Sequence, residues 1–131
     1  MPGISVNLSG TPNAALSRTV ARELTSLTCT LLDKKPVNTT VAVQYIALED
    51  WFINEQSLAE LGKNSFRLTV SITEGTNTKF QIAAYHKAAF ELLSKLLDEV
   101  HPHSNVHVVE CSAAGYGYEG VTQEYRHQHA S

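Results

Sequence analysis

The feature that most constrains the fold of this chain is an internal repeat of one pattern of strands and helices. In the first half, residues 4–8 alternate like a strand, apolar residues at three- and four-residue spacing predict a helix, and residues 40–48 predict a second strand. The second half repeats this order, with strands over 66–72 and 106–111 and a helix over 76–100. The sequence therefore predicts a βαβ unit that occurs twice.

The two halves also align residue by residue. The matches that lie 65 positions apart are Thr11 with Thr76, Leu31-Leu32-Asp33 with Leu96-Leu97-Asp98, and Val41 and Val43 with Val106 and Val108. The first strands match at 64, because Glu74 is one extra residue. Because βαβ crossovers are right-handed and join parallel strands, we expect an α/β fold: a four-stranded mixed sheet with two helices on one face.

The expected domain is single and spans residues 1–131. Its first unit covers about 2–48, a connection covers 49–65, the second unit covers about 66–111, and a C-terminal segment covers 112–131. The first helix should begin at Thr11-Pro12, and the second should carry an apolar stripe of Phe80, Ala84, Ala88, Leu92 and Leu96. We expect the sheet face without helices to carry exposed Val, Ile and Leu, which predicts an oligomer.

Composition excludes several classes of protein. Hydrophobic residues make up 43% and charged residues 18% of the chain, which is typical of a globular domain. A net charge of −3 without a Lys/Arg run argues against nucleic-acid binding. No apolar stretch approaches a membrane span and no signal-peptide pattern opens the chain, so we expect no membrane partner and a cytoplasmic location. Cys29 and Cys111 are interpreted as reduced packing residues.

The second residue is a candidate base. Removal of Met1 would make the Pro2 nitrogen a secondary amine at the start of the first strand. An ordinary α-amino group has a pKa near ~8, and burial or a neighbouring cation lowers that pKa. Pro2 could therefore be neutral and basic near pH 7, although a processed terminus without any role remains the alternative.

Together these features resemble the tautomerase superfamily. The resemblance rests on Pro2 at an immediate strand, on the repeat, on Lys35-Pro36, and on the Ser-Ala-Ala-Gly-Tyr-Gly-Tyr run over 112–118. The last two are similar to segments of the macrophage migration inhibitory factor type. The helix around Phe90-Glu91-Leu92-Leu93 is similar to one in the 5-carboxymethyl-2-hydroxymuconate isomerase type.

The resemblance implies a cofactor-independent keto-enol tautomerase, assembled as a homotrimer, that acts on a small carbonyl or enol substrate. It implies Pro2 as general base and Lys35 as the cation beside it, with Lys34 as an alternative for that place. Substrate would contact Trp51, Phe52, His107, Tyr116 and Tyr118, supplied by the same or a neighbouring subunit. Two other readings stay open: Lys35 as a solvated lysine at a helix end, and the aromatic residues as packing at a subunit seam.

Arginines at the positions where the family binds dicarboxylates are missing. Gly10-Thr11-Pro12, Gly75-Thr76-Asn77 and Ala42 stand there, and Arg126 lies in a tail that we expect to be flexible. We therefore expect a monocarboxylate or an uncharged keto or enol substrate. The alternatives are a protein that kept the fold and lost the chemistry, or a decarboxylase or hydratase, whose usual arginine and acidic partners are absent here.

The histidines do not predict a metal site. His101, His103 and His107 form one group and His127 and His129 another, but no carboxylate or thiol completes a recognisable ligand set. We therefore expect neither a metal nor a cofactor.

Overall fold

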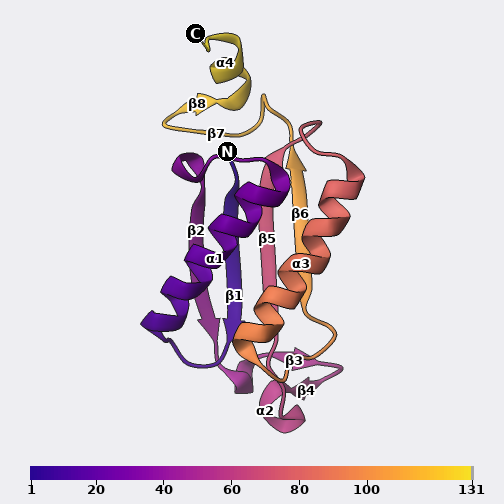
Figure 1. The fold of residues 1–131 in the computed structure, drawn as a ribbon. Helices are drawn as coiled ribbons and strands as arrows, with labels where there is room; N and C mark the ends of the chain where they lie inside the picture. The colour runs from indigo at the N-terminus through magenta and orange to yellow at the C-terminus, as the bar shows by residue number, and fades with distance from the viewer. Residues whose placement is uncertain (131) are drawn as a thin grey trace.

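The computed structural model describes residues 1–130 and contains a mixed four-stranded sheet in the order β2-β1-β5-β6 (Figure 1). Strand β1 (Gly3–Ser9) pairs in parallel with β2 (Thr40–Ile46), and β5 (Phe66–Thr73) pairs in parallel with β6 (Asn105–Cys111). The two parallel pairs join through the antiparallel contact of β1 with β5. The expected mixed sheet of two βαβ units is confirmed.

Helices α1 (Ala14–Leu32) and α3 (Lys79–Leu97) lie side by side on one face of the sheet (Figure 1). Each begins later than predicted, because a side chain just before the helix satisfies the free backbone N–H groups of its first turn. The Asn13 carboxamide oxygen accepts from the Leu16 N–H at 3.0 Å, and Thr78 forms a capping box with Gln81. Helix α1 therefore begins at Ala14 and not at Thr11-Pro12.

The hydrophobic core lies between this face and the two helices. From the sheet it takes residues that alternate along β1 and β5, and from the helices it takes one stripe each: Ile4, Val6, Leu8, Phe66, Leu68, Val70, Ile72, Val20, Leu24, Leu32, Tyr85, Ala89 and Leu93. Of the stripe predicted for the second helix, Leu92 and Leu96 pack against this core, but the fully buried residues are one position further along, at Tyr85, Ala89 and Leu93. Phe80 is 75% exposed, whereas Tyr85 is fully buried because its hydroxyl pairs with the Thr28 hydroxyl at 2.7 Å.

The opposite face of the sheet carries no helix and is mostly polar. Because side chains alternate along a strand, the apolar set that packs under the helices leaves a different set outside: Ser5, Asn7, Ala42, Gln44, Arg67, Thr69, Ser71, His107 and Val109. The expectation that this face exposes Val, Ile and Leu was therefore wrong. The strands have one apolar set, and the helices already cover it.

The repeat continues beyond the sheet, into segments that sequence reasoning treated as a connection and a tail. After β2 and the short 3-10 helix η2 (Leu48–Asp50) come β3 (Phe52–Ile53), β4 (Gln56–Ser57) and α2 (Leu58–Leu61). After β6 come β7 (Gly117–Tyr118), β8 (Val121–Thr122) and α4 (Gln123–Gln128), and each of these begins 65 residues later than its counterpart. The two hairpin–helix segments lie at opposite ends of the sheet (Figure 1).

Backbone contacts within the two segments match as well. The Leu58 N–H donates to the Trp51 carbonyl at 2.9 Å, and the Gln123 N–H donates to the Tyr116 carbonyl at 2.9 Å, again 65 positions on. Ser57 and Thr122 cap α2 and α4 in the same way. Within residues 1–130, no helix combines the length and the apolar character that crossing a membrane requires.

Candidate active site

The N-terminus lies at the sheet end that carries the β7–β8 hairpin and α4. Pro2 is buried, and its carbonyl accepts from the Thr40 N–H at 3.3 Å, which fixes it at the start of β1. Met1, directly before it, lines a cavity of about 550 Å³. The other lining residues come from the ends of α1 and β5 and from the C-terminal segment: Lys34, Asn38, Thr73, Thr76, Ala113, Tyr118, Gln123, Glu124, Arg126 and His127.

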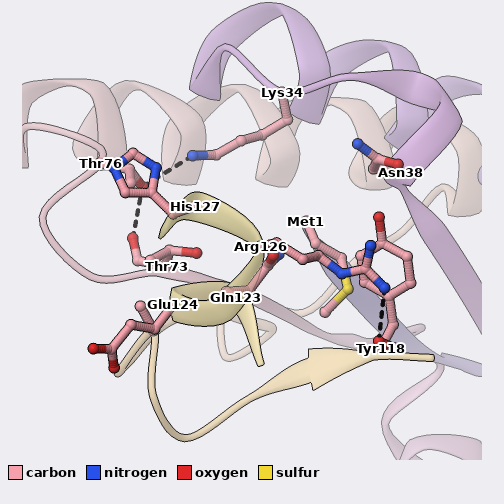
Figure 2. A pocket seen from close by; sticks show the side chains of 11 residues that line it. Met1, Lys34, Asn38, Thr73, Thr76, Tyr118, Gln123, Glu124, Arg126 and His127 are labelled. Atoms are coloured by element: carbon pink, nitrogen blue, oxygen red, sulfur yellow. Dashed lines mark hydrogen bonds between the residues drawn. The ribbon is translucent and has the colours of Figure 1, made fainter. Parts of the chain in front are cut away.

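Lys34 is the cation that the turn after α1 brings to this cavity. Asp33 has a positive φ of 55°, which ends the helix, and the Lys34 N–H then donates to the Cys29 carbonyl at 3.0 Å. The Lys34 ammonium donates to the Thr76 hydroxyl at 3.0 Å, and that hydroxyl donates to the Thr73 carbonyl at 2.6 Å (Figure 2). The ammonium is therefore held in place at the cavity wall.

The environment of the N-terminal amine favours its neutral form. Burial lowers the pKa of the Met1 amine, and the Lys34 charge lowers it further. Burial also lowers the pKa of Lys34 itself. Burial and the Lys34 charge therefore both weaken the hold of the Met1 amine on its proton.

Lys35 does not line the cavity. It is exposed and precedes the 3-10 helix η1 (Pro36–Asn38), where its carbonyl accepts from the Asn38 N–H at 3.0 Å. Of the two neighbouring lysines, the structure thus brings the alternative candidate, Lys34, to the N-terminus.

Tyr116 connects the C-terminal segment to the N-terminus. Its hydroxyl pairs with the Thr73 hydroxyl and donates to the Met1 carbonyl oxygen at 3.4 Å. The Tyr116 hydroxyl therefore contacts the peptide group that joins Met1 to Pro2. Burial raises the pKa of Tyr116, so the hydroxyl remains a proton donor at neutral pH.

Tyr118 and Arg126 form a stacked pair at the same cavity (Figure 2). The guanidinium carbon of Arg126 lies 3.8 Å from the centre of the Tyr118 ring. An Nη atom of Arg126 also donates to the Tyr118 carbonyl at 3.0 Å and to a Glu119 carboxylate oxygen at 3.2 Å. Sequence reasoning missed Arg126 because it treated the tail as flexible. The 65-residue offset that runs through Thr122 and Ser57 could have identified the helix.

The remaining predicted site residues lie elsewhere in this chain. Trp51 and Phe52 are at the opposite end of the sheet, where they line a cavity of about 310 Å³ together with Arg67 and His103. His107 is exposed on the open face of the sheet, paired with Thr69. The structure therefore groups Pro2, Tyr116 and Tyr118 and separates them from the other three.

The hairpin–helix segments at the two ends of the sheet differ in the side chains that their helices α2 and α4 place against the sheet end. In α2, Leu58 is fully buried and Leu61 is half-buried, and the neighbouring Asn64 side chain donates to the Leu97 and Asp98 carbonyls. The positions in α4 that correspond to the two leucines are Gln123 and Arg126, which line the large cavity. One copy of the segment thus seals its end, whereas the other places polar side chains around an opening.

Residues 1–130 contain no cluster of three or more His, Cys, Asp or Glu side chains arranged to hold a metal ion.

Comparisons with known proteins find similarity in structure but not in sequence. No family model matches the chain, and no curated protein matches it. The Q0 fused 4-OT wild-type symmetric trimer is similar in structure, with a TM-score of 0.79 and 15% sequence identity over 93% of this chain and 96% of that chain. Pt0534 inactivated by 2-oxo-3-pentynoate has a TM-score of 0.81 and 11% identity over 94% of this chain and 97% of that chain. The macrophage migration inhibitory factor-like protein of Entamoeba histolytica has a TM-score of 0.76 and 13% identity over 92% of this chain and 97% of that chain. The chain has the tautomerase/MIF-like fold that these proteins share.

Proposed function

We propose that this chain, once Met1 is removed, is a cofactor-independent keto-enol tautomerase or isomerase in which the Pro2 nitrogen is the general base. The observation that carries the proposal is the cavity at the N-terminus, where burial and then the Lys34 charge lower the pKa of the Met1 amine, and where the Tyr116 hydroxyl contacts the Met1–Pro2 peptide group. The fold shared with fused 4-OT and Pt0534 supports it.

The proposed reaction is a proton transfer between carbon and oxygen of a small carbonyl compound. The neutral Pro2 amine takes a proton from the carbon next to the carbonyl, and the C–H electron pair forms a C=C bond while the oxygen gains negative charge. The Lys34 ammonium and the Tyr116 hydroxyl stabilise that charge. The prolinium then returns its proton, to the oxygen for an enol or to carbon in the reverse direction, so no redox partner is needed.

Lys34 takes the role that the resemblance gave to Lys35, because Lys34 lines the cavity and lowers the pKa of the terminal amine. Tyr118 forms a wall of the same cavity. Trp51, Phe52 and His107 stay predictions, since in this chain they could reach a substrate at Pro2 only from a neighbouring subunit.

The proposed assembly is a homotrimer. The Q0 fused 4-OT protein of the same fold is a symmetric trimer. Analytical ultracentrifugation of the full chain should give a particle of three chains, and a monomer at micromolar concentration would contradict this assembly.

The test of the catalytic proposal is turnover of phenylenolpyruvate by protein whose intact mass shows loss of Met1. We expect Pro2→Ala to lower kcat/KM by a factor of about 100 or more, because it replaces the secondary amine in the position of the base. Equal rates for the two proteins would exclude Pro2 as the base.

A chemical label provides an independent test. Pt0534 is inactivated by 2-oxo-3-pentynoate, an alkyne that the adjacent ketone makes reactive toward a neutral amine. We expect the processed chain to gain one adduct on the peptide that begins with Pro2. Protein that retains Met1 should gain no adduct on Pro2, because Pro2 is then an amide.

One observation favours a second candidate, a protein of this fold without the chemistry. Met1 lines the cavity (Figure 2), and a retained Met1 makes the Pro2 nitrogen a non-basic amide. The cavity would then serve only to bind a ligand. Intact-mass measurement of protein purified from its native source, with Met1 present, would favour this candidate.

A further inference from the structure

The C-terminal segment, residues 112–128, covers the end of the sheet where the chain begins. Its hairpin and helix, β7, β8 and α4, lie beyond the sheet at the N-terminus (Figure 1). Met1 is half-buried there. Four residues of α4 line the same cavity as Met1: Gln123, Glu124, Arg126 and His127. The first residue of the chain therefore faces the part of the chain that is synthesised last.

The peptide group between Met1 and Pro2 is held from both sides. The Tyr116 hydroxyl donates to the Met1 carbonyl oxygen at 3.4 Å, and the Pro2 carbonyl oxygen accepts from the Thr40 N–H at 3.3 Å. Pro2 is buried, and Gly3 directly after it pairs with both β2 and β5. An aminopeptidase must draw the terminal amine, this carbonyl group and the next residue into its own site. In the folded chain, the carbonyl group and the residue after it are already engaged.

The C-terminal segment is held closed by hydrogen bonds within it and to the sheet. The Glu124 N–H donates to the Ala113 carbonyl at 2.8 Å, and the Gln123 N–H donates to the Tyr116 carbonyl at 2.9 Å. The Tyr116 hydroxyl also pairs with the Thr73 hydroxyl at the end of β5. Because Tyr116 contacts both the helix and the sheet, a change in the backbone beside it should open the segment.

The order of synthesis leaves the terminus open before it is covered. Met1 and Tyr116 are 115 positions apart, so the segment cannot close until the chain is nearly complete. A chain of 131 residues takes roughly 7–26 s to synthesise at about 5–20 residues per second. In that time methionine aminopeptidase, which removes a Met that precedes a small residue, can reach Met1. After closure, only transient local opening exposes it.

We propose that the C-terminal segment is a barrier to N-terminal processing: Met1 is removed while the chain is being made, and closure of residues 112–128 preserves whichever terminus is then present. The barrier itself does not depend on the chemistry of the site. Its value as regulation rests on the proposed function, in which only chain without Met1 has the basic Pro2 amine. The fraction of active chains is then set during synthesis and stays constant after folding.

Full-length chain that retains Met1 tests the barrier. It is made with methionine aminopeptidase inhibited, purified, mixed with the active enzyme and followed by intact mass. The reference is a peptide of residues 1–8, which has the same cleavage site without the fold. We expect the folded chain to lose Met1 at least about 100-fold more slowly than the peptide, because only the open form is cleaved. Equal rates would show that the barrier does not exist.

Gly117→Ala is the variant that should open the segment. A Cβ atom at Gly117 would overlap with the Val121 carbonyl oxygen across the β7–β8 hairpin, so the backbone beside Tyr116 has to move. Gly115→Ala is the matched control, since its Cβ would lie 3.6 Å from the Ser112 carbonyl oxygen, an ordinary contact. We expect Gly117→Ala to lose Met1 about tenfold faster than the wild type, and Gly115→Ala to differ by less than about twofold.

Hydrogen exchange of the β1 amides separates local opening from loss of the fold. In Gly117→Ala, protection of residues 4–8 should stay at the wild-type level while Met1 is removed faster. If that protection falls as well, Tyr116→Phe decides: it removes the hydroxyl contacts, keeps the ring and should speed Met1 removal about three- to tenfold. The proposal is wrong if neither variant loses Met1 faster than the wild type.

The outcomes separate this proposal from the proposed function. If the folded chain loses Met1 as fast as the peptide, while turnover by the processed chain depends on Pro2, the barrier is wrong and the base is right. If the folded chain keeps Met1 and the processed chain turns over no enol, the barrier stands and the tautomerase proposal fails.

Discussion

The hydroxyl of Tyr116 donates a hydrogen bond of 3.4 Å to the carbonyl oxygen of Met1, and so connects the segment after β6 to the residue before Pro2. These residues are 115 positions apart. The contact places a phenol hydroxyl at the Met1–Pro2 peptide group, whose nitrogen would become the terminal amine.

Tyr116→Phe should lower kcat for enol tautomerisation about 10- to 100-fold, because the oxyanion loses a donor. KM should change less, since the ring remains. Tyr125→Phe is the matched control, because this tyrosine lies on α4 and is exposed. Equal losses in the two variants would show that the Tyr116 hydroxyl has no special part.

Lys34→Met should shift the acidic limb of the pH–rate profile to higher pH. The base is the neutral amine, which exists above its pKa. Burial and then the Lys34 charge lower the pKa of the Met1 amine, and we expect the same causes to act on the Pro2 amine once Met1 is removed. Removing the charge raises the pKa, so higher pH is needed to free the base.

Lys35→Met provides the comparison for this measurement. Lys35 is exposed and does not line the cavity, so its substitution should move the limb less. A larger shift for Lys35→Met than for Lys34→Met would restore Lys35 to the role that the resemblance implied.

Tyr85 should make the fold sensitive to alkaline pH. Burial raises the pKa of its hydroxyl from 10.0 to about 12, so the folded chain holds this proton more tightly than the unfolded chain. The resulting stabilisation is complete below pH 10.0 and is lost as pH rises toward about 12.

Tyr85→Phe should remove that part of the alkaline loss, seen as a flatter dependence of urea stability on pH. At pH 7 the variant should be less stable by about 1–3 kcal/mol, because the buried Thr28 hydroxyl loses its partner. An unchanged pH dependence would show that Tyr85 does not control it.

The two hairpin–helix segments should differ in their importance for stability. Leu58→Ala removes a fully buried side chain and should cost about 2–5 kcal/mol in the free energy of unfolding. Gln123→Ala, at the corresponding position of α4, should change it by less than about 0.5 kcal/mol. Similar losses for both would contradict the contrast between a sealed and an open end.

The sequence was sufficient for the repeat and the sheet because apolar periodicity and matched positions such as Thr11 and Thr76 report on the backbone directly. The prediction from the sequence was wrong where a hydrogen bond between side chains affects which residues are buried. Tyr85 lies in the core with its hydroxyl paired to that of Thr28, a contact between helices that no local pattern reveals. The polar character of the open face was missed because one apolar set was assigned to both faces.

The candidate site shows the same limit. Pro2 and Tyr116 were predicted from a terminal position and a short motif, both of which are local features. Arg126 was missed because its place depends on α4 folding over the N-terminus, and Lys34 was ranked second because one turn of backbone at Asp33 decides which lysine faces the cavity. The tertiary structure therefore determines that Arg126 and Lys34 line the cavity.

The most direct test of the account is the pKa of the Pro2 amine in processed protein, measured by NMR titration of chain labelled with ¹⁵N-proline. The account predicts a single titration with a pKa below the ~8 of an ordinary α-amino group, and a rise of that pKa in Lys34→Met. A pKa at or above ~8, or a Pro2 signal that does not titrate, would contradict the claim that this cavity makes Pro2 a base.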